Sequence, residues 1–354
     1  MQVETKARSS FAFLVLTYNH QDYILEHLES VKYLVLLHGN DIDVDLIIND
    51  DCSRDETQTL VQQWLNINAS LFRHIKTLFN PKNLGTCASI NNMLSHMVAD
   101  RCKMTAGDDV YSFENIFELT QHSSDIAMVS GRVLYLFGDA LNVDRLSNHL
   151  ATATQVIYQN ATLLHRFKHF SYNNAPNLLY ATECLLHPTV RAFLGHFQVT
   201  EDWPLQVAIA RQFPERRFAL ISEVLVYYRR TTGSTYIVAK QRFSKDKNLI
   251  YDDLIKQEIR WIERMRLLIR KFCFNRESYW VNKLLNLDFY FFAFSYASRI
   301  WSIILHDKRL EMKVDQHQQH YNRIQAAAMA VRTHINTRNN SRLSSPLDNS
   351  STTL

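Results

Sequence analysis

Three pairs of acidic residues occur where carboxylates can do chemistry. They are Asp50 with Asp51, Asp108 with Asp109, and Glu201 with Asp202. Carboxylates hold hard divalent cations, accept hydrogen bonds from bases and sugar hydroxyls, and act as general bases. Each pair taken alone also fits a turn or a helix cap, because aspartate favours both. Three pairs at the ends of predicted elements together favour one shared site.

The elements that would position these residues alternate between strands and helices. Short apolar runs predict buried strands at residues 11–16, 44–49, 72–79 and 102–106. Apolar residues at helical spacing predict helices over 22–37 and 88–98. Ser53 and Glu56 form a capping-box pattern, which predicts a further helix from about residue 54. This alternation predicts an α/β fold with a mainly parallel sheet flanked by helices.

Ligands of such sheets bind at the carboxyl ends of the strands. Asp50 and Asp51 directly follow one predicted strand, and the loop TYNH follows another. The chain contains no GxGxxG and no GxxxxGK[ST] motif, so the known glycine loops for binding phosphate are absent from it. A ligand that carries phosphate would therefore need a divalent metal held by carboxylates. The segment TAGDDVYS, residues 105–112, is the best candidate for holding that metal.

Five segments in order resemble the inverting nucleotide-sugar glycosyltransferases of family 2. They are LTYNHQDYILEHLESV, IINDDCSRDET, NPKNLGTCASINN, AGDDVYS and TEDWPL, between roughly residues 10 and 235. The resemblance implies the GT-A fold, a Rossmann-like, mixed and mainly parallel sheet, in residues 1–235. It implies a nucleotide-diphosphate-sugar donor, with a UDP-sugar as the default, and a divalent metal, Mn²⁺ or Mg²⁺. It also implies transfer to a hydroxyl of a glycan or lipid-linked acceptor.

The resemblance, carried over residue by residue, implies roles for these side chains. Asp202 would be the catalytic base with Glu201 beside it, and Asp108, followed by Asp109, would hold the metal. The implied donor-binding residues are Thr17, Tyr18, Asn19, Asp50, Asp51, Asn83, Gly85, Asn91, Gly107, Asp108, Arg229 and Arg230. Among them, the first acidic pair would bind the base and ribose. The two arginines either hold phosphate or belong to an exposed basic turn.

Two positions depart from the family pattern. Ala106 stands where the first acid of an Asp-x-Asp motif is expected, so one polar contact to the donor is lost or comes from Asp109. Ile90 stands where relatives often have arginine, so a basic residue is lost unless Lys82 substitutes. These departures leave a non-catalytic, membrane-associated adaptor as one alternative. A nucleotidyltransferase is another, although TYNH lacks the glycine-rich, basic character that such an enzyme would need.

The chain changes character after about residue 235. In residues 255–272 apolar side chains recur every three or four positions, and basic residues occupy the other faces. An aromatic run follows at 289–305, and the stretch 337–354, rich in Ser, Thr and Asn, predicts a disordered tail. We expect a helical region over 236–336. Residues 255–305 would contact a membrane peripherally or pack on the catalytic domain, and the helices would also suit a homodimer contact.

The composition bears on possible binding partners and on cellular location. The 354 residues include 39 Lys and Arg against 35 Asp and Glu, and a net charge of +4 does not indicate nucleic-acid binding. The five cysteines are widely spaced without a CxxC pair, which favours reduced thiols in the cytoplasm. The N-terminal segment has no apolar signal region, and no uninterrupted apolar run is long enough to span a membrane. The expected location is cytoplasmic, at most peripheral on the membrane, and the resemblance implies cell-surface polysaccharide or lipopolysaccharide biosynthesis.

Overall fold

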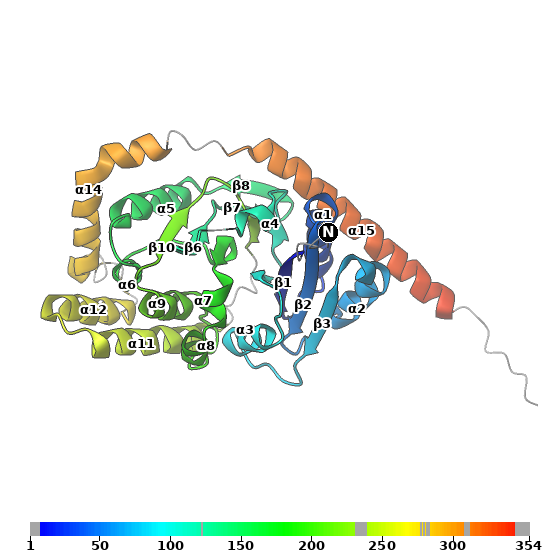
Figure 1. The fold of residues 1–354 in the computed structure, drawn as a ribbon, viewed down its shortest axis with the longest axis horizontal. Helices are drawn as coiled ribbons and strands as arrows, with labels where there is room; N and C mark the ends of the chain where they lie inside the picture. The colour runs from blue at the N-terminus through cyan, green and yellow to red at the C-terminus, as the bar shows by residue number, and fades with distance from the viewer. Residues whose placement is uncertain are drawn as a thin grey trace, which may run out of the picture.

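A computed structural model describes residues 8–343, apart from residues 122, 231–238, 277, 279, 281–283 and 308–311. Its N-terminal sheet consists of four parallel strands in the order β3-β2-β1-β4 (Figure 1). The strands are β1 (Ser9–Thr17), β2 (Ile42–Asp50), β3 (His74–Phe79) and β4 (Arg101–Ala106). They coincide with the four predicted apolar runs, so the sequence prediction of a parallel sheet is confirmed.

Helices cover both faces of this sheet, which explains why β1 is apolar without interruption. Phe11 and Phe13 on one face pack with α1 (Ile24–His38) and α2 (Thr57–Asn68). Leu14 on the other face packs with α3 (Thr86–Ser95). The predicted start of α2 near residue 54 is wrong, because the Ser53 side chain donates to Asp50 instead of capping the helix.

The middle of the chain adds two smaller mixed sheets and several helices. One sheet has the order β10-β6-β9 and the other β5-β11-β7-β8. Their strands are β5 (Val110–Tyr111), β6 (Ile126–Ser130), β7 (Leu134–Phe137), β8 (Ala140–Val143), β9 (Leu178–Tyr180), β10 (Arg217–Leu220) and β11 (Val226–Arg229). The helices are α4 (Ile116–Leu119), α5 (Arg145–Tyr158), α6 (Leu163–Lys168), α7 (Thr182–Leu186), α8 (Pro188–Leu194) and α9 (Asp202–Gln212). Short 3₁₀ turns lie at Ala69–Leu71 and Ala175–Asn177.

The C-terminal region is helical, as predicted, but its first helices divide differently. They are α11 (Lys240–Gln257), α12 (Trp261–Phe274), α14 (Leu287–Asp307) and α15 (Val314–Leu343). The single helix predicted over 255–272 is therefore wrong. Glu258 ends α11, because its carboxylate accepts a hydrogen bond from the Arg260 backbone N–H (3.0 Å) and pairs with Lys168 (2.6 Å).

Helix α15 returns to the N-terminal part of the molecule and lies along α1 (Figure 1). Its buried residues include Tyr321, Ile324 and Ile335. The helix continues past residue 337 to Leu343, into the stretch predicted to be a disordered tail, and residues 344–354 lie outside the described part. Among the described helices, none has the length and apolar character needed to cross a membrane.

Candidate active site

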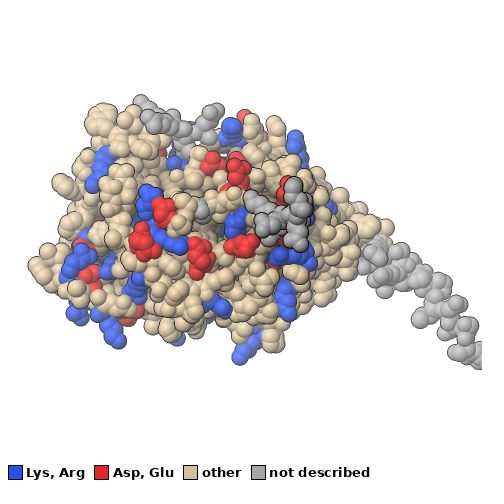
Figure 2. Space-filling view, viewed as in Figure 1, with Lys and Arg blue, Asp and Glu red and all other residues tan. Residues whose placement is uncertain are grey.

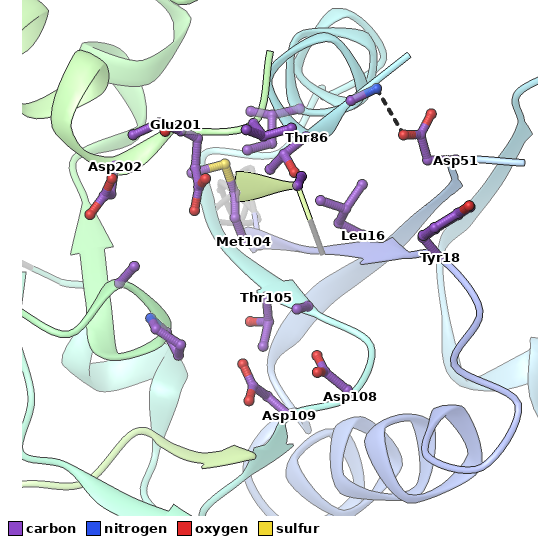
Figure 3. A pocket seen from close by; sticks show the side chains of 18 of the residues that line it. Leu16, Tyr18, Asp51, Thr86, Met104, Thr105, Asp108, Asp109, Glu201 and Asp202 are labelled. Atoms are coloured by element: carbon purple, nitrogen blue, oxygen red, sulfur yellow. Dashed lines mark hydrogen bonds between the residues drawn. The ribbon is translucent and has the colours of Figure 1, made fainter. Parts of the chain in front are cut away.

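The carboxyl ends of β1, β2 and β4 meet at one edge of the N-terminal sheet. Thr17 is paired with Asp50, and the Asp51 N–H donates to the Thr17 carbonyl (2.9 Å). The Gly107 N–H donates to the Leu16 carbonyl (2.7 Å), which holds the turn after β4 against the same edge. A cavity of about 390 Å³ opens there (Figure 3). Small-molecule sites commonly have volumes of this order.

The cavity brings together residues from widely separated parts of the chain. The predicted site residues that line it are Tyr18, Asp51, Asn83, Gly85, Asp108, Asp109, Glu201 and Asp202. The predicted residues outside its lining are Thr17, Asn19, Asp50, Asn91, Gly107, Arg229 and Arg230. All three acidic pairs of the sequence therefore contribute at least one carboxylate to one cavity.

Asp51 fixes the loop that forms one wall of the cavity. Its carboxylate accepts hydrogen bonds from the Leu84 N–H (2.7 Å), the Gly85 N–H (2.8 Å) and the Asn80 side-chain amide (2.9 Å). Gly85 has a φ of +89°, and a Cβ there would lie 2.4 Å from the Gln198 carbonyl oxygen. Only glycine fits this position, where the loop packs directly on the segment that precedes Glu201.

Three predicted donor-binding residues have protein partners outside the cavity. The buried Asp50 carboxylate accepts hydrogen bonds from the Ser53 N–H (2.8 Å) and the Gln58 side chain (2.6 Å). The Asn91 amide donates to the Arg191 carbonyl (3.0 Å). Asn19, whose φ is +55°, accepts a hydrogen bond from the Arg54 backbone N–H in the turn before α2 (2.9 Å). These side chains hold the loops around the cavity.

The turn between β4 and β5 carries Asp108 and Asp109 in different environments. Asp109 is buried, and one of its oxygens accepts a hydrogen bond from the Arg229 N–H (2.9 Å). Burial, with the negative charge of Asp108 added to it, raises the pKa of Asp109 well above its ordinary value. The Asp108 carboxylate faces the cavity, with His20 Nε2 at 3.9 Å.

This turn fits a divalent cation. Asp108 offers a carboxylate at the cavity wall, and Mg²⁺ and Mn²⁺ take oxygen ligands, often one or two carboxylates together with substrate phosphates. The second carboxylate, Asp109, has one oxygen engaged by Arg229. Burial, and then the charge of Asp108, raises the pKa of Asp109. A cation held at this turn would favour the ionised form of both acids.

Glu201 and Asp202 lie on another wall of the cavity, at the start of α9 (Figure 3). The Asp202 carboxylate accepts a hydrogen bond from the Trp203 N–H (2.7 Å). Burial, and then the charge of Asp202, raises the pKa of Glu201 to about 8. Glu201 is therefore protonated near neutral pH. An acceptor held in the cavity would meet one protonated acid and one neighbouring carboxylate.

Sequence reasoning missed three residues around this cavity. Arg242 of α11 lines it and donates to the Asn83 side chain (3.1 Å), whereas Lys82, the predicted substitute for a lost basic residue, lies outside the lining. His20, within the quoted loop TYNH, also lines it. Asp246 of α11 is buried, and one of its oxygens accepts the backbone N–H groups of residues 198, 199 and 200 at 2.7–3.0 Å. No motif marks the residues of α11.

The two predicted phosphate-binding arginines have protein partners. Arg229 is buried, pairs with Glu26 and donates to the Asp108 carbonyl (2.7 Å), so it supports the acidic turn from behind. The Arg230 guanidinium lies over the Tyr135 ring, 4.4 Å from its centre. Most of the basic loop predicted to lie near the diphosphate, residues 231–238, falls outside the described residues.

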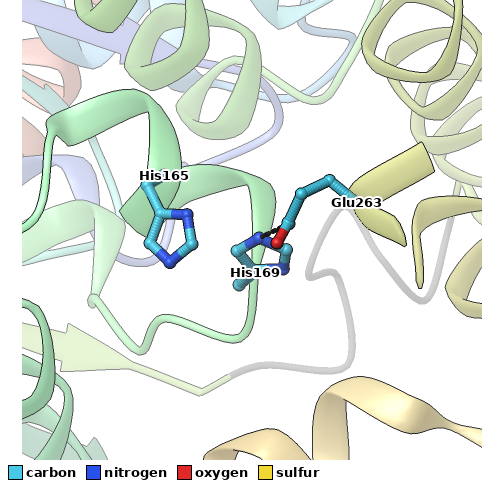
Figure 4. A group of neighbouring side chains, drawn as sticks. All are labelled: His165, His169 and Glu263. Atoms are coloured by element: carbon cyan, nitrogen blue, oxygen red, sulfur yellow. Dashed lines mark ion pairs between the residues drawn. The ribbon is translucent and has the colours of Figure 1, made fainter. Parts of the chain in front are cut away.

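A second cluster of titratable side chains lies away from the cavity (Figure 4). His165 and His169 stand four residues apart beside Glu263, a spacing that suits metal ligands. However, His169 Nε2 lies only 2.7 Å from Glu263 Oε2, whereas two ligands of one zinc ion lie roughly 3.3 Å apart. Arg266 also pairs with Glu263 and with Asp288, which contacts His169. The cluster is thus an ion-pair network, which ties α12 and α14 to the end of α6.

Comparisons with known proteins agree with this architecture. The model of glycosyl transferase family 2 matches residues 12–184, and no curated protein matches the chain. TarS 1–349 of S. aureus, in complex with UDP-GlcNAc, is similar with a TM-score of 0.53 and 15% identity, over 91% of this chain and 89% of that one. The mannosyltransferase PcManGT of Pyrobaculum calidifontis, in complex with GDP-Man and Mn²⁺, has a TM-score of 0.51 and 13% identity. The match covers 91% of this chain and 86% of that one.

At such low identities the two solved structures show the fold alone. The family model covers β1 to α7 and therefore includes the turn with Asp108 and the loop with Asp51. It ends before Asp202 and before α11. The predicted resemblance and fold class are confirmed: residues 12–184 match glycosyl transferase family 2, and the chain has the GT-A fold.

Proposed function

We propose that the protein is an inverting glycosyltransferase that moves a sugar from a nucleotide-diphosphate donor to a hydroxyl of a glycan or lipid-linked acceptor. One observation carries the proposal: Asp108 and Asp202, from separate parts of the chain, line the same cavity at the carboxyl ends of parallel strands. The first is suited to hold a cation near a diphosphate, and the second to accept a proton. A non-catalytic adaptor would have no need for both.

Several side chains around the cavity support donor binding. Arg242 brings a guanidinium to the wall, where the sequence pattern lacked a basic residue, and guanidinium groups bind phosphate oxygens well. Tyr18 lines the cavity and is 40% exposed, which leaves its ring open for stacking on a base. When bound at Asp108, a divalent cation supplies charge neutralisation for the diphosphate leaving group. Mn²⁺ or Mg²⁺ is the proposed metal.

The proposed reaction is a single displacement. The acceptor hydroxyl oxygen bonds to the anomeric carbon while the bond from that carbon to the diphosphate oxygen breaks. Asp202 takes the hydroxyl proton as general base, and the nucleoside diphosphate leaves on the opposite face. No covalent intermediate forms, so the anomeric configuration is inverted. Holding donor and acceptor in line supplies much of the rate enhancement.

The proposed setting is the cytoplasm, in cell-surface polysaccharide or lipopolysaccharide biosynthesis. All five cysteines lie in the described residues and are free thiols, which supports a reducing compartment. A UDP-sugar is the proposed donor. TarS was solved with UDP-GlcNAc and PcManGT with GDP-Man, so both nucleotide classes should be compared.

The test is a thermal-shift screen of the purified protein against UDP-, GDP-, CMP- and dTDP-sugars, with and without Mn²⁺. A ligand that binds only the folded state raises the unfolding midpoint by mass action. We expect one nucleotide class to raise the midpoint in the presence of metal, and Asp108→Asn to abolish the metal-dependent part. Asp202→Asn should keep the donor-induced shift but lower donor hydrolysis or transfer by roughly 10²–10⁴-fold, the usual contribution of a general base.

Asp41→Asn is the matched control, because Asp41 is exposed at the far end of β2 and the substitution removes the same charge. It should leave both the shift and turnover unchanged. If Asp108→Asn and Asp202→Asn proteins, shown to be folded, retain donor shift, turnover and cellular function, the adaptor alternative replaces the transferase. A metal-dependent shift with nucleoside triphosphates alone would favour the nucleotidyltransferase.

A further inference from the structure

Helix α12 exposes a row of large apolar side chains. Trp261, Met265, Leu268 and Phe272 follow one another at intervals of four, three and four residues, which places them on one helical face. Trp261 is 74% exposed and the other three are 42–46% exposed. Leu267 on the opposite face is fully buried against α11 and α9 in the core. Met265 and Phe272, which belong to the apolar stripe predicted over 255–272, therefore lie on the exposed face of α12.

Helix α14 exposes a second row. Phe294 and Trp301 are each 78% exposed, and Leu305, four residues further on, is 56% exposed. The other face of the helix packs on α5, where Ile303 is fully buried. Together, Trp261, Met265, Leu268, Phe272, Phe294, Trp301 and Leu305 define the α12–α14 surface. Isolated exposed apolar residues are ordinary, but two aromatic-rich rows on contacting helices are not.

Basic side chains are exposed on the helices of this surface. Arg260, Arg264 and Arg299 are exposed, and the latter two form no ion pair with any residue that the structure describes. Of the described acids on this segment, Glu258 and Asp288 are buried and Glu263 is partly buried, and each pairs with a cation. Neutralised acids and exposed arginines give the surface a positive character that the whole-chain charge does not reveal.

The surface is held in place by the ion-pair network around His169, which Figure 4 shows beside Glu263. Asp288 at the start of α14 binds Arg266 of α12 (2.8 Å) and His169 (3.2 Å), and all three side chains are buried. Because the network fixes both helices to the catalytic domain, the apolar rows cannot turn inward without breaking it. In Figure 1, α12 and α14 form one end of the molecule, and the part of that end visible in Figure 2 is mostly uncharged.

We propose that the α12–α14 surface binds peripherally to a lipid bilayer that contains anionic headgroups. Tryptophan and phenylalanine partition into the interfacial region of a bilayer, and exposed arginines are attracted to its negative surface. This complementarity distinguishes a lipid surface from a second copy of the chain, whose matching surface would carry the same positive charge. No described helix spans a membrane, so the contact is interfacial. The inference extends the proposed function, because it brings a lipid-linked acceptor within reach, but it does not depend on catalysis.

The experiment is co-sedimentation of the full chain with phosphatidylcholine vesicles, with and without phosphatidylglycerol. We expect strong binding only to the vesicles with phosphatidylglycerol, and weaker binding as salt is raised. Phe294→Ser with Trp301→Ser should weaken binding on the order of tenfold or more, because each ring loses its burial in the interface. Arg264→Glu with Arg299→Glu should weaken it to a similar extent, on the order of tenfold, by opposing the surface potential.

Leu36→Ser with Val98→Ser is the matched control, because both residues are exposed apolar side chains outside α12 and α14. This variant and Asp202→Asn should bind vesicles like the unaltered protein, so failure of the lipid inference is distinct from failure of the transferase proposal. Unchanged binding by the Phe294 and Trp301 variant would overturn the inference. A dimer in solution that this variant dissociates, with no vesicle binding by the unaltered protein, would assign the surface to a second copy.

Discussion

Glu201 and Asp202 are adjacent acids whose surroundings give them different properties. Burial and the charge of Asp202 raise the pKa of Glu201 from 4.5 to about 8, so the folded protein keeps a proton on Glu201 that the unfolded chain releases. A neutral Glu201 beside the proposed base can donate a hydrogen bond to a sugar or acceptor oxygen, and it avoids a second negative charge next to the diphosphate.

This protonation makes stability depend on pH. The folded state binds more protons than the unfolded state between pH 4.5 and about 8, so the free energy of unfolding falls as pH rises through that window. Glu201→Gln removes the titration. The thermal midpoint of this variant, relative to that of the unaltered protein, should therefore rise between about pH 5 and about pH 9. A midpoint difference that stays constant across this range would contradict the raised pKa.

Single residues were predictable from sequence where they belong to short motifs. Asp51 and Asp108 follow strands and Asp202 begins a helix, each within a recognisable short motif, and all three line the cavity. Arg242, which lines the cavity, and Asp246, which holds the segment before Glu201, were not predictable, because packing of α11 places them and no local pattern marks them. A contact between distant segments leaves no periodicity in one sequence.

Helix α11 acts on the site through the segment that precedes Glu201. Asp246 accepts three consecutive backbone N–H groups from residues 198–200, and the Gln198 carbonyl in turn accepts the Cys87 N–H (3.1 Å). One buried carboxylate therefore sets the position of both the base segment and the loop at Gly85. We regard Asp246 as a positioning residue, since it holds backbone that carries the proposed base.

Replacing Asp246 should test whether it positions the proposed base without affecting how tightly the substrate binds. Asp246→Ala leaves three buried donors without an acceptor, at about 1–3 kcal/mol for each unsatisfied group, and displaces the base. We expect kcat to fall on the order of 10²-fold with a smaller change in KM, as a displaced catalytic group predicts. Asp246→Asn keeps an acceptor oxygen and should recover much of kcat. Equal kcat values for the two variants, in folded protein, would remove Asp246 from this role.

The elements themselves were predicted well where the hydrophobic period was clear and poorly where side chains interrupt it. The strands β1 to β4 were found from apolar runs because both faces of the sheet are covered. The prediction of one helix over 255–272 was wrong. The spacing of apolar residues continues past Glu258, but the Glu258 carboxylate accepts the Arg260 N–H and ends α11. Side-chain to backbone hydrogen bonds of this kind are invisible to periodicity.

At the scale of the whole molecule, α15 links the end of the described chain to its beginning. Its buried Tyr321 donates to Glu26 of α1 (3.1 Å), and Glu26 pairs with Arg229, which donates to the Asp108 carbonyl (2.7 Å). The acidic turn of the cavity is therefore supported by a series of contacts that ends in α15. Ile324 and Ile335 add apolar burial against the N-terminal part.

Removing α15 should destabilise the entire fold. A protein truncated after residue 311 loses the burial of Tyr321, Ile324 and Ile335, each worth about 1.5–3 kcal/mol. We expect the free energy of unfolding in urea to fall on the order of 5 kcal/mol, with loss of the metal-dependent donor shift. Truncation after residue 343 removes none of these contacts and is the control. A protein that ends at residue 311 and keeps its unfolding midpoint would show that α15 is dispensable.

The position of α15 against α1 has a consequence for synthesis. A ribosome makes α1 first and α15 last, so for most of translation the apolar surface that α15 will cover stays open on the nascent chain. Neither Asp246 nor Tyr321 exists when the acidic turn emerges from the exit tunnel. The protein should therefore acquire its donor site only after α15 has been made, and chains stalled near residue 311 should be substrates for chaperones rather than partly active enzymes.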